Sequence, residues 1–288
     1  MTYHEQASVF ECEGDRLIGI ATHPQQPAAT GVVIIVGGPQ YRAGSHRQFT
    51  LLARQLAEHG IASFRFDYRG MGDSEGAMRN FEAIDADIKA AIDTFTTLVP
   101  NIRQVVLWGL CDAASAALYY GHTDPRVKSM ILLNPWVHTE AGAARARLKH
   151  YYLARLLSRA FWAKLLSGKI QFGESIVGLA KSAQQANSDT VGKPVPGADT
   201  RHGSATYIDQ MLSGFKAFKG KIQIILSGED LVAQEFEQLR KTNVNWTRAC
   251  SQPRVKLSMV KNANHTFSSA AWREEAKKLT LTTVSLKS

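Results

Sequence analysis

Cys111 stands at a predicted bend between a strand and a helix, where a thiol can act as a nucleophile. It lies in Val-Val-Leu-Trp-Gly-Leu-Cys-Asp-Ala-Ala, residues 105–114. The apolar run predicts a buried strand over 105–108 and a helix over 113–120, which places the thiol at the positive end of the helix. The pattern is that of a nucleophile elbow, Gly-x-Ser-x-Gly, with Cys in place of Ser and the small Ala113 in place of the second Gly. A helix N-terminus favours the thiolate, which is the reactive form of cysteine.

A thiol nucleophile needs a base, and the base needs an acid that orients it. His265 lies in the loop after the apolar run 255–260, and Asp230 lies just beyond a Gly turn after the run 222–226. The carboxyl ends of parallel strands meet along one edge of a sheet, so groups at these ends can converge although they are far apart in sequence. The chain order of thiol, acid and histidine therefore predicts a catalytic triad, with Glu229 as the alternative acid.

Each of these residues also has an ordinary structural interpretation. Cys111 alone is typical of a small buried apolar residue, and His265 alone of a surface histidine. Asp230 alone is typical of the N-cap of a helix over 231–240. The joint placement at three strand ends, in this order, favours catalysis over the three separate interpretations.

Backbone donors for an oxyanion are expected after the predicted strand 32–36, where residues 37–40 read Gly-Gly-Pro-Gln. The proline has no N–H, so the predicted donor is Gly38, with Gln40 as the alternative. The second predicted donor is the N–H of Asp112, directly after the nucleophile. An ordinary strand-to-helix turn is the other interpretation of the two glycines. The charge of the Asp112 carboxylate opposes a thiolate beside it, unless the side chain points away and caps the first turn of the helix.

Four side chains near these loops are candidate substrate contacts. Gln40, Arg42 and His46 follow the glycines, and Trp136 follows the predicted strand 127–133. Arg42 and His46 can alternatively dock the next helix, and Trp136 can alternatively belong to an apolar core.

A sheet must position these residues, and strand patterns alternate with helix patterns along the chain. This alternation predicts an α/β fold with a mostly parallel, eight-stranded sheet covered by helices on both faces. A hairpin signal at Gly14-Asp15 gives the sheet an antiparallel N-terminal edge. The expected strands are 8–13, 16–22, 32–36, 62–66, 105–108, 127–133, 222–226 and 255–260, and the expected helices are 49–59, 84–98, 113–120 and 268–282.

The stretch 136–214 interrupts this alternation and is predicted to be a helical cap, inserted into a core domain of residues 1–135 and 215–288. Residues 140–167 carry apolar side chains at four-residue spacing with basic residues between them, which is typical of a helix. Residues 188–204 are rich in Gly, Pro and Ser and predict a loop. The basic face of the cap fits an anionic substrate or a membrane surface, or is simply solvated.

The composition is that of a globular protein, with 288 residues, 44% apolar and 20% charged, and a net charge of +9. The N-terminal residues lack the pattern of a secretory signal, and the longest aliphatic run is too short to span a bilayer, so a cytoplasmic location is expected. Three widely spaced cysteines favour neither a disulfide framework nor a zinc site. We expect no cofactor, no metal and no nucleic-acid partner, and the sequence does not indicate an oligomeric state.

The chain resembles an α/β-hydrolase over nearly its full length, and its triad order matches the family's order of nucleophile, acid and histidine. Asp-Tyr-Arg-Gly-Met-Gly-Asp-Ser at 67–74 resembles the family's D-x-R-G-x-G-x-S loop. We interpret Arg69, Gly70 and Gly72 as structural, because glycine supplies the turn and the arginine fork can tie it to nearby carbonyls. Val36-Gly-Gly-Pro resembles the family's H-G-G-P oxyanion loop, with Val36 where histidine is common.

A narrower resemblance is to exosortase A system-associated hydrolase 1. It is carried by residues 36–49, 109–115 and 134–136. Those proteins belong with exopolysaccharide and protein-sorting systems of Gram-negative bacteria, so the resemblance implies a genetic setting more than a substrate.

Together these observations predict a hydrolase that cleaves an ester or thioester of a small or acylated substrate. The predicted route is a Cys-His-Asp triad and an acyl-enzyme intermediate. Two alternatives stay open: an acyltransferase that uses the same triad with an acceptor other than water, and a non-catalytic binding protein for an acylated glycan or lipid.

Overall fold

The computed structural model describes residues 3–38, 40–138 and 206–285. They belong to one compact core unit, Met1–Ala143 with Thr206–Ser288, whereas the second unit, Ala144–Ala205, lies outside the described residues.

The strands are β1 Tyr3–Cys12, β2 Asp15–Pro24, β3 Thr30–Ile35, β4 Ser63–Phe66, β5 Gln104–Leu110, β6 Val127–Leu133, β7 Lys221–Ser227 and β8 Val255–Val260. The α-helices are α1 Gln48–Glu58, α2 Asp85–Leu98, α3 Asp112–Tyr120, α7 Tyr207–Ala217, α8 Leu231–Thr242, α9 Val244–Cys250 and α10 Ala270–Ser285, and short 3-10 helices cover Ser45–Arg47 and Phe81–Ala83.

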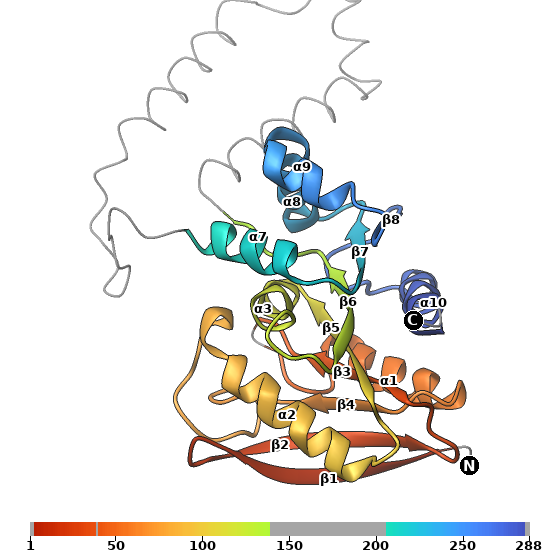
Figure 1. Cartoon of the computed structure of the whole chain (residues 1–288). Coiled ribbons are helices and arrows are strands. Elements are labelled where there is room, and N and C mark those ends of the chain that lie inside the picture. Colours follow the sequence, from red (N-terminus) through yellow and green to blue (C-terminus); the bar gives the residue numbers. More distant parts are fainter. Residues whose placement is uncertain (1–2, 39, 139–205, 286–288) are drawn as a thin grey trace, which may run out of the picture. The chain divides into compact units, whose positions relative to one another are not determined.

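The eight strands form one sheet in the order β1-β2-β4-β3-β5-β6-β7-β8 (Figure 1). All pairs from β4–β3 to β7–β8 are parallel. The β1–β2 and β2–β4 pairs are antiparallel. The predicted α/β fold with an antiparallel N-terminal edge is confirmed. Because the inner strands run in one direction, their carboxyl ends share one edge of the sheet, and that edge carries the candidate site.

Apolar side chains cover both faces of the sheet, which explains why the inner strands read as continuous apolar runs. In β5, Val105 and Leu107 belong to one core cluster, which lies under α2, α3 and α7. Val106 and Trp108 belong to the other, which lies under α1 and α10. The strand that leads to Cys111 is therefore fixed from both sides.

The elements differ from the predicted ones at three places. Both hairpin strands are longer than expected, and β5 continues through Gly109 to Leu110, directly before the nucleophile. Helix α9 was not predicted, because seven residues are too few for a helical period to show in the sequence. The Asn243 side chain caps its N-terminus, and the buried Trp246 anchors it.

The predicted cap, 136–214, lies largely outside the described residues, and so does its basic face. Its described carboxyl end begins at Thr206. Thr206 and Asp209 form a capping box that begins α7, and α7 packs on α3 as part of the core unit. In the part of the chain that the structure describes, no helix has the length and apolar character needed to cross a bilayer.

The loop after β4 has the structural role that the sequence indicated, with one correction. Gly70 and Gly72 have φ of 76° and 54°, values that suit glycine. Arg69, however, does not bind carbonyls. Its guanidinium pairs with the carboxylates of Asp87, at 2.8 Å, and Glu13. The loop is thus held to α2 by the buried pair of Arg69 and Asp87, and to the turn after β1 by the exposed Glu13.

Candidate active site

Cys111 joins β5 to α3 with a φ of 65° and a ψ of −125°. A positive φ at a residue with a side chain costs on the order of 1–3 kcal/mol and is found at functional bends. The Cys111 N–H donates to Leu133 O at 2.8 Å, which ties the bend to the end of β6. The bend needs Gly109, because a Cβ there would lie 2.6 Å from the carbonyl carbon of Ala113. The predicted elbow geometry therefore exists in this chain.

The structure brings together the thiol of Cys111, the ring of His265 and the carboxylate of Asp230. His265 Nδ1 lies 2.9 Å from Asp230 Oδ2, and the ring also hydrogen-bonds the Cys111 thiol. The bond to Asp230, and then the bond to Cys111, raise the pKa of His265 to about 10, against the opposing effect of burial. The raised pKa favours the protonated form of the His265 ring, the imidazolium.

Asp230 combines two of the interpretations offered by the sequence. Its carboxylate accepts the N–H groups of Val232 and Ala233 at 3.3 and 3.2 Å, so it caps α8 while it binds His265. Glu229, the alternative acid, is exposed. The helix cap fixes the Asp230 side chain, and the fixed side chain in turn holds the histidine ring.

Asn134 is a buried residue at the site to which the sequence analysis gave no role. Its Nδ2 donates to Ser227 Oγ at 2.8 Å and to the His265 carbonyl at 3.3 Å, and its Oδ1 accepts the Ser227 N–H at 2.8 Å. Ser227 Oγ in turn donates to the Asn264 carbonyl at 3.0 Å. Asn134 therefore joins the ends of β6 and β7 to the loop that carries the histidine. A polar residue directly after an apolar strand was the only signal in the sequence.

Replacing Asn134 by alanine should lower the free energy of unfolding by about 1–3 kcal/mol, because the buried Ser227 N–H loses its acceptor. Loosening the His265 loop should also lower kcat for ester cleavage. Urea unfolding and steady-state kinetics measure the two effects. Asn101→Ala, at an exposed position before β5, is the control and should change neither. Full stability and full activity in Asn134→Ala would contradict this role.

One of the two predicted oxyanion donors is already paired. The Gly38 N–H donates to Asp112 Oδ1 at 2.7 Å. The same oxygen accepts the N–H of Ala113 at 2.9 Å. The alternative donor, the Gln40 N–H, is bound to Gly38 O at 2.8 Å. The Asp112 side chain thus caps the first turn of α3, as one interpretation held, but it does so across the predicted oxyanion hole.

Two of the four candidate substrate contacts are engaged within the protein. The Arg42 guanidinium pairs with Asp67 and, at 2.6 Å, with Asp73. Gln40 Oε1 accepts the Ser45 N–H at 3.0 Å. Both side chains therefore hold the loop that follows the glycines against its neighbours, and a contact with substrate stays a prediction for each.

The other two candidates differ in their distance from the thiol. Trp136 is half-buried, and its ring stacks on His138 with ring centroids 5.1 Å apart. The backbone N–H of Trp136 donates to the backbone carbonyl of Cys111 at 3.3 Å. Trp136 is thus adjacent to the elbow. His46 is exposed, in a left-handed conformation with φ of 53°. Substrate binding by either side chain stays a prediction.

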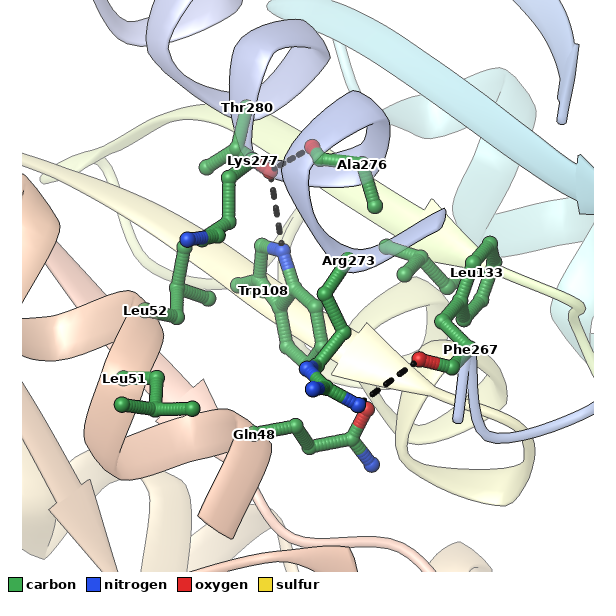
Figure 2. Close-up of a pocket in the computed structure, with 10 residues that line it drawn as sticks. All are labelled: Gln48, Leu51, Leu52, Trp108, Leu133, Phe267, Arg273, Ala276, Lys277 and Thr280. Carbon is green, nitrogen blue, oxygen red and sulfur yellow. Dashed lines mark hydrogen bonds between the residues drawn. The ribbon is translucent and has the colours of Figure 1, made fainter. Parts of the chain in front are cut away.

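Two cavities lined by described residues lie away from the thiol. Figure 2 shows a cavity of about 20 Å³ between α1, β5 and α10, where Trp108 Nε1 donates to Thr280 Oγ1 at 3.2 Å and Arg273 donates to the Phe267 carbonyl. It has room for about one water molecule. A larger cavity, of about 910 Å³, lies at the opposite, amino end of the parallel strands. Neither is lined by Cys111, Asp230 or His265. Among the described residues, no group of three or more His, Cys, Asp or Glu side chains could hold a metal ion.

Comparison with known proteins places this arrangement in a family. Among curated proteins, the polyketide transferase GrgF of a Penicillium species is 33% identical over 100 residues, which is 33% of this chain and 33% of that protein. This chain therefore aligns with about a third of that relative's length. The solved structure of GrgF has a TM-score of 0.60 at 20% identity and covers 98% of this chain and 100% of its own.

Two solved esterase structures share the fold at lower identity. The Pyrococcus furiosus esterase Pf2001 has a TM-score of 0.62 at 14% identity, covering 98% of this chain and 90% of its own. Est1E of Butyrivibrio proteoclasticus, solved with ferulic acid bound, has a TM-score of 0.60 at 15% identity, covering 96% and 99%. Residues 27–268 match the model of the family described as serine aminopeptidase, S33. The chain belongs to this family of α/β-hydrolases.

Proposed function

We propose that this protein is a hydrolase that cleaves an ester or thioester through an acyl-enzyme intermediate on Cys111. The observation that carries the proposal is the hydrogen-bonded chain from Asp230 through His265 to the Cys111 thiol, at the carboxyl edge of the sheet. A nucleophile, a base and an orienting acid in hydrogen-bond contact are the parts that acyl transfer requires. Family membership supports hydrolysis, and the esterase folds among the structural neighbours support an ester-type substrate.

In the proposed reaction, the Cys111 sulfur attacks the acyl carbonyl carbon, and the carbonyl π electrons move to its oxygen. The oxyanion is stabilised by the N–H groups of Gly38 and Asp112. When the tetrahedral intermediate collapses, the bond to the leaving group breaks and His265 gives that group its proton. His265 then takes a proton from water, whose oxygen attacks the thioester carbonyl. Collapse of this second tetrahedral intermediate breaks the bond to sulfur and releases the acid and the Cys111 thiolate, which restores the starting pair with the protonated ring. Asp230 holds the ring through Nδ1 in both halves of the reaction.

The nucleophile favours substrates with good leaving groups. A thiolate is itself a good leaving group, so a tetrahedral intermediate on Cys111 tends to expel sulfur unless the other group leaves readily. Thiols and activated alcohols do so, and amines do not. We therefore place thioesters and activated esters first, and peptide bonds last.

Acyl transfer to an acceptor other than water is the second candidate function. The relative GrgF is named a polyketide transferase, and its likeness to this chain covers the fold as well as a third of the sequence. Transfer needs the same triad and differs only in the molecule that attacks the acyl-enzyme. Product analysis with and without polyol acceptors separates the two: acylated polyol would favour transfer, and free acid alone would favour hydrolysis.

The narrower family resemblance adds a setting to this proposal. If the chain acts with exosortase and exopolysaccharide systems, acylated glycans or lipids are the substrates to test first. A basic cap of residues 136–214 would then attract their anionic groups or a membrane surface. A cytoplasmic location of the enzyme is part of the same prediction.

The test is stoichiometric acylation of the full chain by nitrophenyl acetate, acetyl-CoA and a long-chain acyl-CoA, followed by intact-mass and peptide analysis. We expect one acyl group on Cys111 that disappears as product forms. The other cysteines are internal controls, because burial raises the pKa of Cys250 to about 11 and also raises that of Cys12. His265→Asn should slow acylation by about 10²- to 10⁴-fold, the usual contribution of a general base.

The outcomes decide between the candidates. Acylation of Cys111 followed by release supports an acyl-enzyme. Absence of any Cys111 adduct with all three donors would overturn it and leave the non-catalytic binding protein. Equal labelling of the three cysteines would show that Cys111 is not an activated thiol.

A further inference from the structure

The Asp112 carboxylate occupies the place where the proposed reaction needs an oxyanion. Its Oδ1 accepts the Gly38 N–H at 2.7 Å and the Ala113 N–H at 2.9 Å. The Gly38 N–H is one of the two donors assigned to the oxyanion. That donor is therefore spent on a side chain of the protein itself.

The loop over this carboxylate is shaped to receive an oxygen atom. A Cβ at Gly37 would lie 2.5 Å from Asp112 Oδ1 and 2.3 Å from Leu110 O, so only glycine allows the loop to lie this close to the elbow. Gly38 has φ of 60°, which turns its N–H toward the carboxylate. Converging N–H groups around one anionic oxygen are the arrangement that stabilises a tetrahedral intermediate. Asp112 Oδ1 thus marks the oxyanion hole and fills it.

We propose that the Asp112 carboxylate is a resident plug of the oxyanion hole, which the carbonyl oxygen of an acyl substrate must displace before Cys111 is acylated. The inference rests on the proposed function, because a plug has a consequence only if Cys111 takes an acyl group. Displacement is a rotation of the side chain and makes or breaks no covalent bond.

The surroundings make the plug movable. Burial raises the pKa of Asp112, so its charge is less stable there than in water, and the N–H groups of Gly38 and Ala113 and the charge of His265 only partly offset this. The phenol of Tyr68 is also close enough for the charge of Asp112 to raise its pKa, in addition to the effect of burial. The carboxylate is therefore held in the hole at a cost, which a substrate oxygen that takes its place would relieve.

A plugged hole selects substrates. A substrate carbonyl oxygen has to displace the Asp112 carboxylate from the Gly38 N–H. The carboxylate is the stronger acceptor, because hydrogen bonds to ionised groups are roughly twice as strong as those to neutral groups. A substrate that also binds through its acyl chain or its leaving group supplies the free energy for displacement. Small activated esters should therefore react slowly with the wild type and gain most when the plug is removed.

The experiment compares the rate constant for acylation of Cys111 by nitrophenyl acetate in wild type, Asp112→Ala and Asp112→Asn, from the initial release of nitrophenolate. Asp112→Ala should be faster by about ten- to a hundredfold, up to the value of one oxyanion-hole donor. Asp112→Asn, which keeps the shape but not the charge, should be faster by less. Affinity for a trifluoromethyl ketone, which forms an anionic adduct with the thiol, should rise in the same order.

The matched control is Asp209→Asn, which removes a carboxylate from the first turn of α7 without touching the cluster. It should leave acylation unchanged, and thermal unfolding checks that all variants are folded. If wild-type Cys111 is acylated and both Asp112 variants react at the same rate or more slowly, the plug is refuted and the acyl-enzyme stands. If Cys111 is not acylated in any variant, the proposed function fails with it.

Discussion

A Cys111→Ala variant should lose ester cleavage almost completely, with kcat/KM lower by about 10⁴-fold or more. Removing the nucleophile of a triad costs roughly as much as removing the whole triad, because its members act as a unit. Alanine also fits the site, since the thiol is half-buried and its removal leaves the bend made by Gly109 intact. The loss should therefore appear in kinetics and not in the free energy of unfolding. Steady-state hydrolysis of nitrophenyl esters and acyl-CoA measures it.

Two variants bracket this result. Cys250→Ala removes a thiol outside the cluster and should keep wild-type kcat/KM. His265→Asn should lower kcat/KM by about 10²- to 10⁴-fold, in line with its effect on acylation, and the double variant should lose little more than Cys111→Ala. If Cys111→Ala retained activity within about tenfold of wild type, another group would be the nucleophile, because an alanine offers no side chain for covalent catalysis.

Arg69→Met should cause the largest loss of stability, about 3–5 kcal/mol in the free energy of unfolding. Arg69 and Asp87 are both almost completely buried. Asp87 accepts from the Arg69 backbone N–H at 2.8 Å, from Nε at 3.0 Å and from Nη2 at 2.8 Å. Removing the guanidinium leaves the buried Asp87 carboxylate without its counter-charge. This destabilises the fold far more than replacing both partners with apolar residues would. Urea or thermal unfolding measures the loss.

The comparison that tests this explanation is the double variant Arg69→Met with Asp87→Leu. It should be more stable than Arg69→Met alone, since no charge is then left unpaired. Arg16→Met breaks the exposed pair with Glu75 near the same loop and should have little measurable effect. A small effect of Arg69→Met itself would show that Asp87 finds another partner or takes up a proton at little cost.

The sheet could be predicted from the sequence because its strands are buried on both faces. Runs such as 32–36 and 222–226 fall on β3 and β7, since burial on both sides leaves a largely apolar segment that is easy to recognise. The positions of Cys111, Asp230 and His265 followed from the same logic. All three lie just after parallel strands, so the direction of the strands brings their side chains to one edge.

What could not be predicted depends on contacts between loops from different strands. The pairing of Asp112 with Gly38 requires the loop after β3 to lie over the elbow after β5, and sequence spacing does not indicate which way the carboxylate turns. Asn134 owes its role to Ser227, from a neighbouring strand 93 residues away. The carboxylate partners of Arg69 were not predicted either. Glu13 and Asp87 come from separate segments on either side of the loop, and sequence spacing does not indicate that they meet there.

The order of the strands along the chain also bears on when, during synthesis, the Cys111 thiol acquires its histidine and acid neighbours. Cys111 follows β5, whereas Asp230 and His265 follow β7 and β8, the last two strands to leave the ribosome and the outermost at one end of the sheet. Joining β7 to β6 closes a long stretch of chain, and such distant pairings form late in folding. A nascent or half-folded chain thus carries its cysteine without a histidine beside it. Under the proposed function, Cys111 would become reactive only when the C-terminal strands dock, and the unfinished protein would be spared from unwanted acylation.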